Sequence, residues 1–216
     1  MIDSRRLLGL IFSLLIALSS TVAAQWRLDG NEKLRNFHID EHLNASASAQ
    51  PSPEAIRELR SKLPRGASIY IVDLRQESHG FANQLPVSWH EEHNHANAGK
   101  TLAEIERDER EQLGALIGTE TTFVPLGRSD TEEFSPKTIK VRTVQTEREV
   151  VEDADFSYVR IPAADMVAPD ANVVEQFIDF VNKLPKDAWL HFHCQAGHGR
   201  TTTFLVMYEI LKNPKT

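Results

Sequence analysis

The feature that most constrains this chain of 216 residues is a short segment around its only cysteine, near the carboxyl end. Residues 193–201 read His-Cys-Gln-Ala-Gly-His-Gly-Arg-Thr, so that five residues separate Cys194 from Arg200. The apolar and aromatic run at 189–192 predicts a buried strand, and apolar residues at helical spacing predict a helix over 202–211. The chain is therefore predicted to pass from a strand, through a glycine-rich loop, into the N-terminus of a helix.

Such a loop binds an oxyanion, because its backbone N–H groups converge on one point and the helix N-terminus adds positive potential. Arg200 can hold two oxygens of a phosphoryl group with its planar guanidinium. The same potential favours the thiolate of Cys194, which is the nucleophilic form of the side chain. Thr201 is predicted to donate a hydrogen bond to the sulfur when the sulfur later becomes the leaving group. We therefore predict catalytic roles for Cys194, Arg200 and Thr201.

The other residues of the loop are predicted to surround the phosphoryl group. Its two glycines supply positions where φ can be positive and where the backbone can approach the anion closely. The histidine before the cysteine is expected to fix the loop through hydrogen bonds rather than to act as a base. The alternative is an inert, buried cysteine beside an ordinary turn. The predicted substrate-binding residues of the loop are His193, Gln195, Ala196, Gly197, His198 and Gly199.

A general acid is predicted upstream of the cysteine. Residues 156–161 predict a strand, and Asp165 follows in a loop that is bounded by prolines. Asp170 then predicts the N-cap of a helix. An aspartate on such a loop can protonate the departing alkoxide and later take a proton from the attacking water. The alternative is that Asp165 is only a turn residue.

Three further side chains are candidates for contacts with substrate. Lys100 is predicted to bind an outer phosphate, and the alternative is a solvated loop lysine. Arg75 and His79 follow a predicted strand that should end beside the cysteine loop, so both are candidates for the pocket. Structural hydrogen bonding is the alternative for Arg75.

A cluster of imidazoles also has the residue types of a metal site. His90, His93 and His95 stand close together with Glu91, but their order does not match the His-Glu-x-x-His spacing. We favour a polar loop with imidazoles near the mouth of the pocket, and a metal site is the alternative.

These motifs resemble those of the cysteine phosphatases of protein-tyrosine-phosphatase type, and within them the bacterial phytase-like enzymes, which hydrolyse inositol hexakisphosphate. The resemblance runs from about Leu43 to the end of the chain. It rests on five blocks: LNASASAQPS (43–52), YIVDLRQESHGF (70–81), VSW (87–89), ANAGKT (96–101), and the segment from RIPAADMVAPD to HCQAGHGRTT (160–202).

The resemblance implies an α/β fold, with a protein-tyrosine-phosphatase-like central, mostly parallel sheet flanked by helices and a small β-rich insertion near residues 120–150. It implies that Cys194 is the nucleophile, Arg200 the phosphate clamp and Asp165 the general acid, with no cofactor and no metal. The implied substrate is a small phosphorylated molecule, an inositol polyphosphate, or else a phosphoprotein.

Two other functions stay open beside this one. The first is a protein tyrosine or dual-specificity phosphatase, and the second is a module that binds inositol phosphates without turnover. The family continues through further helices, whereas this chain ends at Thr216, so we expect either a fragment or a shortened member. Met166 stands where relatives often place a histidine after the acid.

The amino-terminal residues 1–24 are predicted to be a signal peptide, because two arginines precede an apolar run over 7–18 and small residues follow it. The run is too short for a dependable membrane span, so no stable span is expected after cleavage. We therefore expect a periplasmic or secreted protein. A loosely packed extension is predicted over 25–50 and a phosphatase domain over 51–216.

The predicted domain begins with a helix over 52–63 and a strand over 68–74. A helix over 101–116 opens with a Thr-x-x-Glu capping box, and its charged run at 107–111 is expected to face solvent. The formal net charge of −7 gives no general attraction for nucleic acid or anionic membranes. We therefore expect no nucleic-acid partner.

Overall fold

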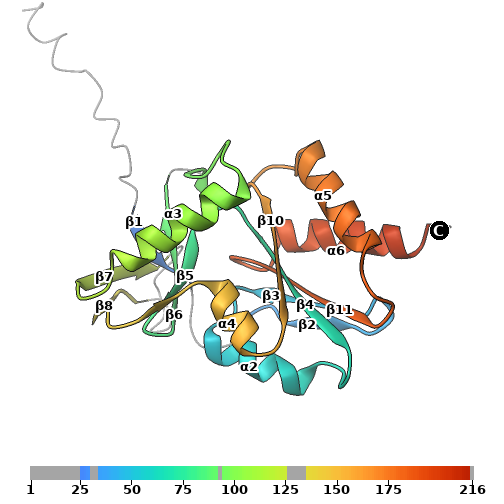
Figure 1. The fold of residues 1–216 in the computed structure, drawn as a ribbon, viewed down its shortest axis with the longest axis horizontal. Helices are drawn as coiled ribbons and strands as arrows, with labels where there is room; N and C mark the ends of the chain where they lie inside the picture. The colour runs from blue at the N-terminus through green and yellow to red at the C-terminus, as the bar shows by residue number, and fades with distance from the viewer. Residues whose placement is uncertain (1–24, 30–33, 92–93, 126–134, 215–216) are drawn as a thin grey trace, which may run out of the picture.

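The computed structural model describes residues 25–29, 34–91, 94–125 and 135–214 (Figure 1). The predicted signal peptide, residues 1–24, lies outside the described residues. Within the described part of the chain, no helix combines the length and the apolar character that crossing a membrane requires.

The centre of the molecule is a five-stranded sheet that positions the cysteine loop. Its first three pairings are parallel and the fourth is antiparallel, so the sheet is mixed. The α/β class predicted from the sequence is confirmed. In order across the sheet, the strands are β10 (Ser157–Ala163), β4 (Ser68–Arg75), β11 (Ala188–Cys194), β3 (Ala45–Ala49) and β2 (His38–Asp40).

The strand that leads to the cysteine, β11, lies in the middle of this sheet between β4 and β3, and all of its residues are buried. Its side chains alternate between the two faces, as the pleat of a strand requires. Phe192 and Cys194 belong to the core on one face, and Trp189 belongs to the core on the other. The end of β11 is therefore held on both sides by packing.

Helices cover both faces of the central sheet (Figure 1). One pair packs with Leu190 and Phe192 of β11, and the other pair packs with Trp189. The first pair is α5 (Ala171–Asn182) and α6 (Gly199–Lys212), and the second is α2 (Pro53–Lys62) and α4 (Glu147–Asp153).

The segment 25–50 differs from the loosely packed extension that the sequence predicts. It supplies three strands, and β3 pairs in parallel with β11 along its whole length. Every residue of β3 is buried. Its sequence, Ala-Ser-Ala-Ser-Ala, lacks the bulky residues that usually signal a strand. Small side chains are needed here because β3 fits beneath the aromatic core of Phe204 and Tyr208.

The second sheet has six strands and lies beside the first (Figure 1). Helix α3 (Leu102–Gly114) covers it, with Leu113 in the same core as Leu28 and Phe123. In order, the strands are β8 (Lys137–Lys140), β7 (Glu120–Pro125), β1 (Gln25–Leu28), β6 (Leu85–His90), β5 (His79–Ala82) and β9 (Val144–Gln145).

The β-rich insertion predicted near 120–150 is therefore not a separate unit. Its strands β7 and β9 pair with β1 and β5, β8 pairs with β7, and its last residues begin helix α4. The hairpin of β5 and β6 turns at Asn83 and Gln84, which both have positive φ. Two such residues in a row form the tight turn that matches the twist of a hairpin.

Helix starts are the best-predicted part of the fold. Thr101 accepts from the backbone N–H of Glu104, whose side chain caps in return, as the capping box predicts. Asp170 accepts from the backbone N–H of Val173 and so caps α5, also as predicted.

The aromatic core behind the cysteine loop yields a stability test. Phe177 is fully buried, and its ring centroid lies 5.1 Å from that of Phe204 and 6.1 Å from that of Phe192. We expect Phe177→Ala to lower the free energy of unfolding by about 3–5 kcal/mol, because it leaves a cavity. Ile210→Ala is the control: Ile210 is 63% exposed, and its removal should change stability by less than about 0.5 kcal/mol. Equal losses in urea denaturation would contradict this assignment of the core.

Candidate active site

The cysteine loop is built between the end of β11 and the start of α6, as the sequence predicts. Cys194 is a free thiol and 3% exposed. Gly197 has a φ of 71°, and a Cβ there would lie 2.5 Å from the backbone nitrogen of Ala49. Only glycine can occupy this position without displacing β3. The loop is therefore held in shape by backbone-to-backbone packing.

A residue near the amino-terminal end fastens the loop from outside. Asn36 Nδ2 donates to the carbonyl oxygen of Ala196 at 2.8 Å and lies 3.2 Å from His198 Nε2. The carbonyl accepts only, so the amide nitrogen must face the loop, and its second hydrogen is then directed at the imidazole. Asn36 itself has a φ of 54°, which asparagine tolerates better than most residues.

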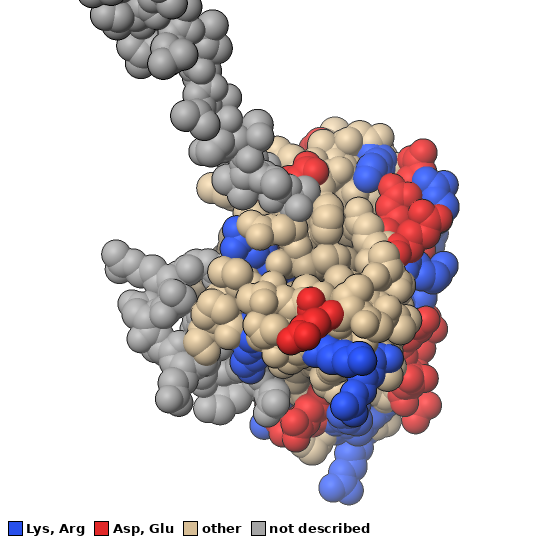
Figure 2. Space-filling view, turned by 90° about the vertical axis from the view of Figure 1, so that its left-hand side faces the viewer, with Lys and Arg blue, Asp and Glu red and all other residues tan. Residues whose placement is uncertain are grey.

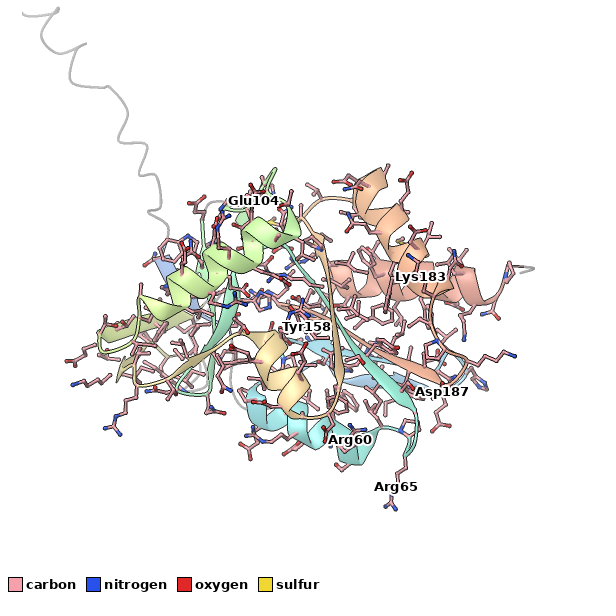
Figure 3. The ribbon with its side chains drawn as sticks, in the orientation of Figure 1. Arg60, Arg65, Glu104, Tyr158, Lys183 and Asp187 are labelled. Atoms are coloured by element: carbon pink, nitrogen blue, oxygen red, sulfur yellow. The ribbon has the colours of Figure 1, made fainter. Side chains whose placement is uncertain are left out.

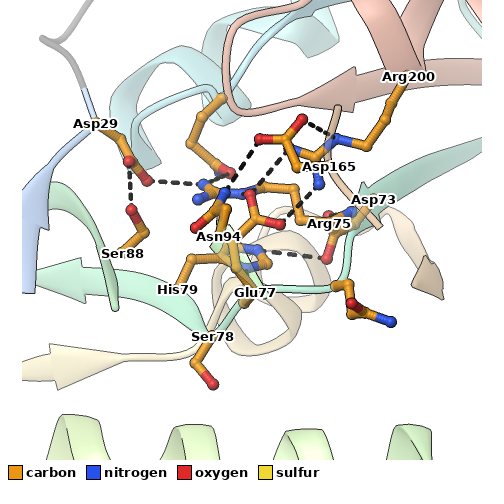
Figure 4. Close-up of polar contacts among 12 residues, drawn as sticks. Asp29, Asp73, Arg75, Glu77, Ser78, His79, Ser88, Asn94, Asp165 and Arg200 are labelled. Carbon is orange, nitrogen blue, oxygen red and sulfur yellow. Dashed lines mark hydrogen bonds and ion pairs between the residues drawn. The ribbon is translucent and has the colours of Figure 1, made fainter. Parts of the chain in front are cut away.

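Arg200, in the first turn of α6, forms a bidentate ion pair with Glu77 through its two terminal nitrogens (Figure 4). Its Nη1 donates to Glu77 Oε2 at 2.7 Å, and its Nη2 donates to Oε1 at 3.0 Å. The other Nη1 hydrogen is directed at the carbonyl oxygen of Ala163 at 3.3 Å. The side edge of the guanidinium, formed by Nε and the remaining Nη2 hydrogen, faces the acid loop, residues 164–170, which connect β10 to α5 and include Asp165. This edge has the geometry that binds two oxygens of a phosphoryl group.

Glu77 is itself held by a second arginine. Its Oε1 accepts from Arg75 Nε at 2.7 Å, and the Arg75 guanidinium also donates to Asp29 Oδ2 at 2.7 Å and to Gln50 Oε1 at 2.9 Å. Burial raises the pKa of the Glu77 carboxyl, but Arg200 and Arg75 lower it by more, so it lies well below its ordinary value. Glu77 is therefore ionised at neutral pH.

Asp165 lies on the loop after β10 and faces Arg200. Its Oδ1 is 3.4 Å from Arg200 Nε and accepts from the backbone N–H of Met166 at 3.0 Å. The two side chains line one cleft of about 490 Å³. The rest of its wall is mostly apolar and comes from the acid loop and α6: Ala163, Met166, Val167, Ala168, Pro169, Gly199, Thr203 and Phe204.

A buried ionic cluster supports the site from behind, where the two sheets meet. His79 Nε2 donates to Glu147 Oε2 at 2.9 Å and lies 3.3 Å from Asp73 Oδ2, while its Nδ1 donates to the carbonyl oxygen of Glu77 at 2.9 Å. Both ring nitrogens thus face acceptors, as an imidazolium requires. Burial lowers the pKa of His79, but Asp73 outweighs it and the pKa is raised to about 10.

Arg160 of β10 completes this cluster. It lies 3.2 Å from Asp73 Oδ2, and its Nη1 donates to Glu109 Oε2 at 2.9 Å. Tyr158, which Figure 3 shows in the interior beside α4, donates its hydroxyl to Asp73 Oδ2 at 2.6 Å. Glu109 is only 3% exposed, so the sequence-based expectation that the charged run 107–111 faces solvent is wrong at this residue.

The side chain of His193 belongs to the same cluster rather than to the pocket. Its Nε2 lies 3.1 Å from Glu147 Oε1, and the residue is fully buried. Burial raises the pKa of the Glu147 carboxyl, but His193 and His79 lower it by more, so that it lies at about 2. His193 is therefore placed to hold β11 against α4. Thr201 is also fully buried, and its hydroxyl makes no hydrogen bond to another described residue.

Two residues predicted to bind substrate do not reach the cleft. Arg75 is 0% and His79 1% exposed, and the donors described above are directed at carboxylates and carbonyls of the protein. The strand before them does end beside the cysteine loop, as expected. Their side chains instead point into the junction of the sheets, where buried carboxylates neutralise them. We therefore correct their roles to structural ones.

Lys100 also lies apart from the cysteine loop. Its Nζ is 2.9 Å from Asn97 Oδ1 and 3.1 Å from Asp108 Oδ2. It lines a separate cavity of about 410 Å³ between the starts of α3 and α5. Binding of an outer phosphate by Lys100 stays a prediction.

In the described part of the chain, one group combines a histidine with carboxylates closely enough to hold a metal ion. The ligand atoms of Asp73, His79 and Glu147 lie within 4.8 Å of one another. Asp73 already accepts from Tyr158 and faces Arg160, so a cation would have to displace both. Of the predicted imidazole cluster, His90 contacts Asn94 and His95 contacts the backbone of Asp165, whereas His93 lies outside the described residues, so the alternative of a metal site there stays open.

Three residues that build the site have no predicted role in the sequence analysis. Glu77 and Glu147 are buried carboxylates, and Asn94 donates to Asp165 Oδ2 at 3.1 Å. Glu77 stands two residues after Arg75, at the end of a predicted strand that runs to the cysteine loop. A carboxylate at the end of this strand, close to Arg75 and to the cysteine loop with its Arg200, could have predicted a buried partner for an arginine. Asn94 and Glu147 carry no comparable signal.

This fold and this site are similar to those of protein-tyrosine-phosphatase-like phytases. The family model of the PTP-like phytases, whose description reads "Inositol hexakisphosphate", matches residues 72–212. The chain belongs to this family.

Solved structures of family members are similar to this chain. One is the PTP-like myo-inositol phosphatase of Mitsuokella multacida in complex with myo-inositol-(1,3,4,5)-tetrakisphosphate, with 34% identity, a TM-score of 0.78, and coverage of 88% of this chain and 38% of that one. Another is a PTP-like phytase of Bdellovibrio bacteriovorus, with 37% identity, a TM-score of 0.76, and coverage of 91% and 71%.

A curated relative is effector protein hopD2 of Pseudomonas syringae pv. tomato, which is 30% identical over 168 residues. The match covers 76% of this chain and 36% of hopD2. The chain thus spans little more than a third of the length of hopD2 and of the Mitsuokella structure.

The raised pKa of His79 predicts a loss of stability at alkaline pH. Its folded-state pKa of about 10 exceeds the ordinary value of 6.5, so the protonated form stabilises the fold fully below pH 6.5. This contribution is lost as the pH rises from 6.5 through 10. We expect the free energy of unfolding to fall by more than about 1 kcal/mol over this range. His79→Gln should be less stable at pH 6 and should lose less on going to pH 10. An equal slope in both proteins, measured by urea denaturation, would show that His79 is neutral in the fold.

Proposed function

We propose that this chain is a cysteine-dependent phosphatase that hydrolyses phosphomonoesters of myo-inositol polyphosphates through a phosphocysteine intermediate. The observation that carries the proposal is the side edge of Arg200, whose Nε makes no hydrogen bond within the described residues and faces Asp165 at 3.4 Å, at the start of the helix that follows Cys194. Family membership supports it, as does the inositol tetrakisphosphate bound to the Mitsuokella relative. The five-stranded sheet, with three of its four pairings parallel, serves as the mostly parallel scaffold of such an enzyme.

The first step transfers the phosphoryl group to the protein. The thiolate of Cys194 attacks phosphorus, so that an S–P bond forms while the bond to the leaving oxygen breaks. Asp165 in its protonated form gives its proton to that oxygen, and the alcohol departs. The free edge of Arg200 and the backbone N–H groups of the loop stabilise the charge on the transferred group.

The second step releases phosphate. A water attacks the phosphocysteine, and Asp165, now a carboxylate, takes a proton from it. The S–P bond breaks, and the sulfur leaves as a thiolate. The hydroxyl of Thr201 has no other hydrogen bond within the described residues and can donate to that sulfur. These steps use only side chains and backbone of this chain, and they consume one water per phosphate released.

A protein tyrosine phosphatase is the second candidate, and the cleft favours it in one respect. The wall beyond Asp165 is apolar, and Met166 and Val167 are 81% and 54% exposed there. An aromatic ring would bury this surface, whereas an inositol ring with several phosphates would not.

The surface charge fits a small anionic substrate better than a nucleic acid. Seen from the end where β7 and β8 lie, lysines and arginines stand beside aspartates and glutamates and form no single basic field (Figure 2). We further propose that residues 1–24 are a signal peptide and that the protein acts in the periplasm or outside the cell. The predicted domain, residues 51–216, would carry the activity together with the strands of 25–50.

One set of assays tests the proposed function. We expect the wild type to release phosphate from inositol hexakisphosphate faster than from a phosphotyrosine peptide, with EDTA present. Cys194→Ser should abolish turnover because no phosphocysteine can form. Asp165→Asn should slow it by about 100-fold or more. Full activity in Cys194→Ser would exclude the mechanism, and a preference for the peptide would select the second candidate. Binding of inositol hexakisphosphate without turnover would identify a binding module.

A further inference from the structure

The segment after β6 contacts the acid loop through two neighbouring residues. Asn94 Nδ2 donates to Asp165 Oδ2 at 3.1 Å, and His95 Nε2 donates to the carbonyl oxygen of Asp165 at 3.2 Å. Two neighbouring residues thus bind both the side chain and the backbone of the predicted acid. Figure 4 shows Asn94 and Arg200 on either side of its carboxylate.

Asn94 is itself fixed in place. It is 5% exposed, and its backbone N–H donates to the carbonyl oxygen of Glu91 at 2.9 Å. Its φ of 63° lies in the left-handed region, which asparagine occupies more readily than most residues. Its Oδ1 lies 3.3 Å from His90 Nδ1. Because the carboxylate of Asp165 only accepts, the amide nitrogen must face Asp165 and the amide oxygen must face His90.

These contacts decide how the carboxylate of Asp165 is turned. Its Oδ1 is bound by the backbone N–H of Met166 and faces Arg200, and its Oδ2 is bound by Asn94. Without Asn94, no other hydrogen bond among the described residues holds Oδ2, and the carboxylate is fixed through Oδ1 alone. Proton transfer to a leaving group requires the donor and the acceptor to lie within about 3 Å of each other. A carboxyl group that can turn away from this position therefore transfers its proton more slowly.

We propose that Asn94 is the positioning residue for the general acid Asp165, with His95 holding the backbone of the acid loop. The proposal rests on the proposed cysteine-phosphatase function. Asn94 exchanges no proton: the proton moves from Asp165 to the leaving oxygen in the first step and from water to Asp165 in the second. Asn94 keeps the carboxylate at the place where both transfers occur.

The proposal makes a prediction that depends on the leaving group. An ester of phenol needs a proton from the acid as its oxygen departs, whereas 2,4-dinitrophenolate is stable enough to leave without one. Loss of a positioning residue for the acid should therefore slow the first ester and spare the second. Damage to the cysteine loop would slow both to the same extent.

The experiment compares kcat/KM of wild type and variants on phenyl phosphate and 2,4-dinitrophenyl phosphate. We expect Asn94→Ala to lower kcat/KM on phenyl phosphate about 10-fold or more, and on the dinitrophenyl ester by less than about 3-fold. Asp165→Asn should show the same pattern more strongly, and His95→Ala the same pattern more weakly. Asn182→Ala is the matched control, because Asn182 is exposed at the end of α5. The vanadate inhibition constant of each variant reports whether the phosphate loop is intact.

Equal loss on both esters in Asn94→Ala, or no loss on either, would overturn the proposal. If Asn94→Ala does not fold, His95→Ala takes its place. A larger loss of kcat/KM on phenyl phosphate than on the dinitrophenyl ester supports the proposal, and equal losses or no loss overturn it. Turnover of both esters without turnover of inositol hexakisphosphate would overturn the proposed substrate and leave the positioning role standing. Turnover of neither ester by the wild type would overturn both.

Discussion

The carboxylate of Glu77 is the interaction on which the rest of the site depends. Fully buried, it binds both terminal nitrogens of Arg200 and the Nε of Arg75. A carboxylate between two arginines is ionised and satisfied even without water, which makes its burial tolerable. Because it takes the end of the Arg200 guanidinium, it leaves the side edge turned to the acid loop. Glu77 thereby sets the orientation of the Arg200 guanidinium.

The same carboxylate lies where the two sheets meet. Arg75 reaches from β4 to Asp29 beside β1, and Arg160, His79 and Glu147 extend the cluster toward α3 and α4. Buried ion pairs of this kind add little net stability compared with apolar packing, but removing one partner leaves an uncompensated charge. The cluster therefore fixes how the sheets are oriented. The apolar cores on the two faces of the central sheet supply the stability that tolerates it.

Local patterns in the sequence predicted the parts of the structure that are local. The loop from Cys194 to Arg200, the acid loop at Asp165 and the helix caps depend on neighbouring residues, and their spacing was sufficient. The strand of alanines and serines at 45–49 gave no such signal, because its small residues reflect what packs above it. Glu77 and Glu109 were missed for a related reason: the sequence does not show which carboxylates have distant arginines as partners.

The position of β11 also has a consequence for the order in which the chain can fold. Its residues 188–194 insert between β3 at 45–49 and β4 at 68–75, so both pairings join segments far apart in the sequence. Contacts of such long range form slowly. Until β11 pairs with them, β3 and β4 each keep one edge without a hydrogen-bonded neighbour. The cysteine loop is thus among the last features to form, and a delay at this step exposes two strand edges to pairing with another chain.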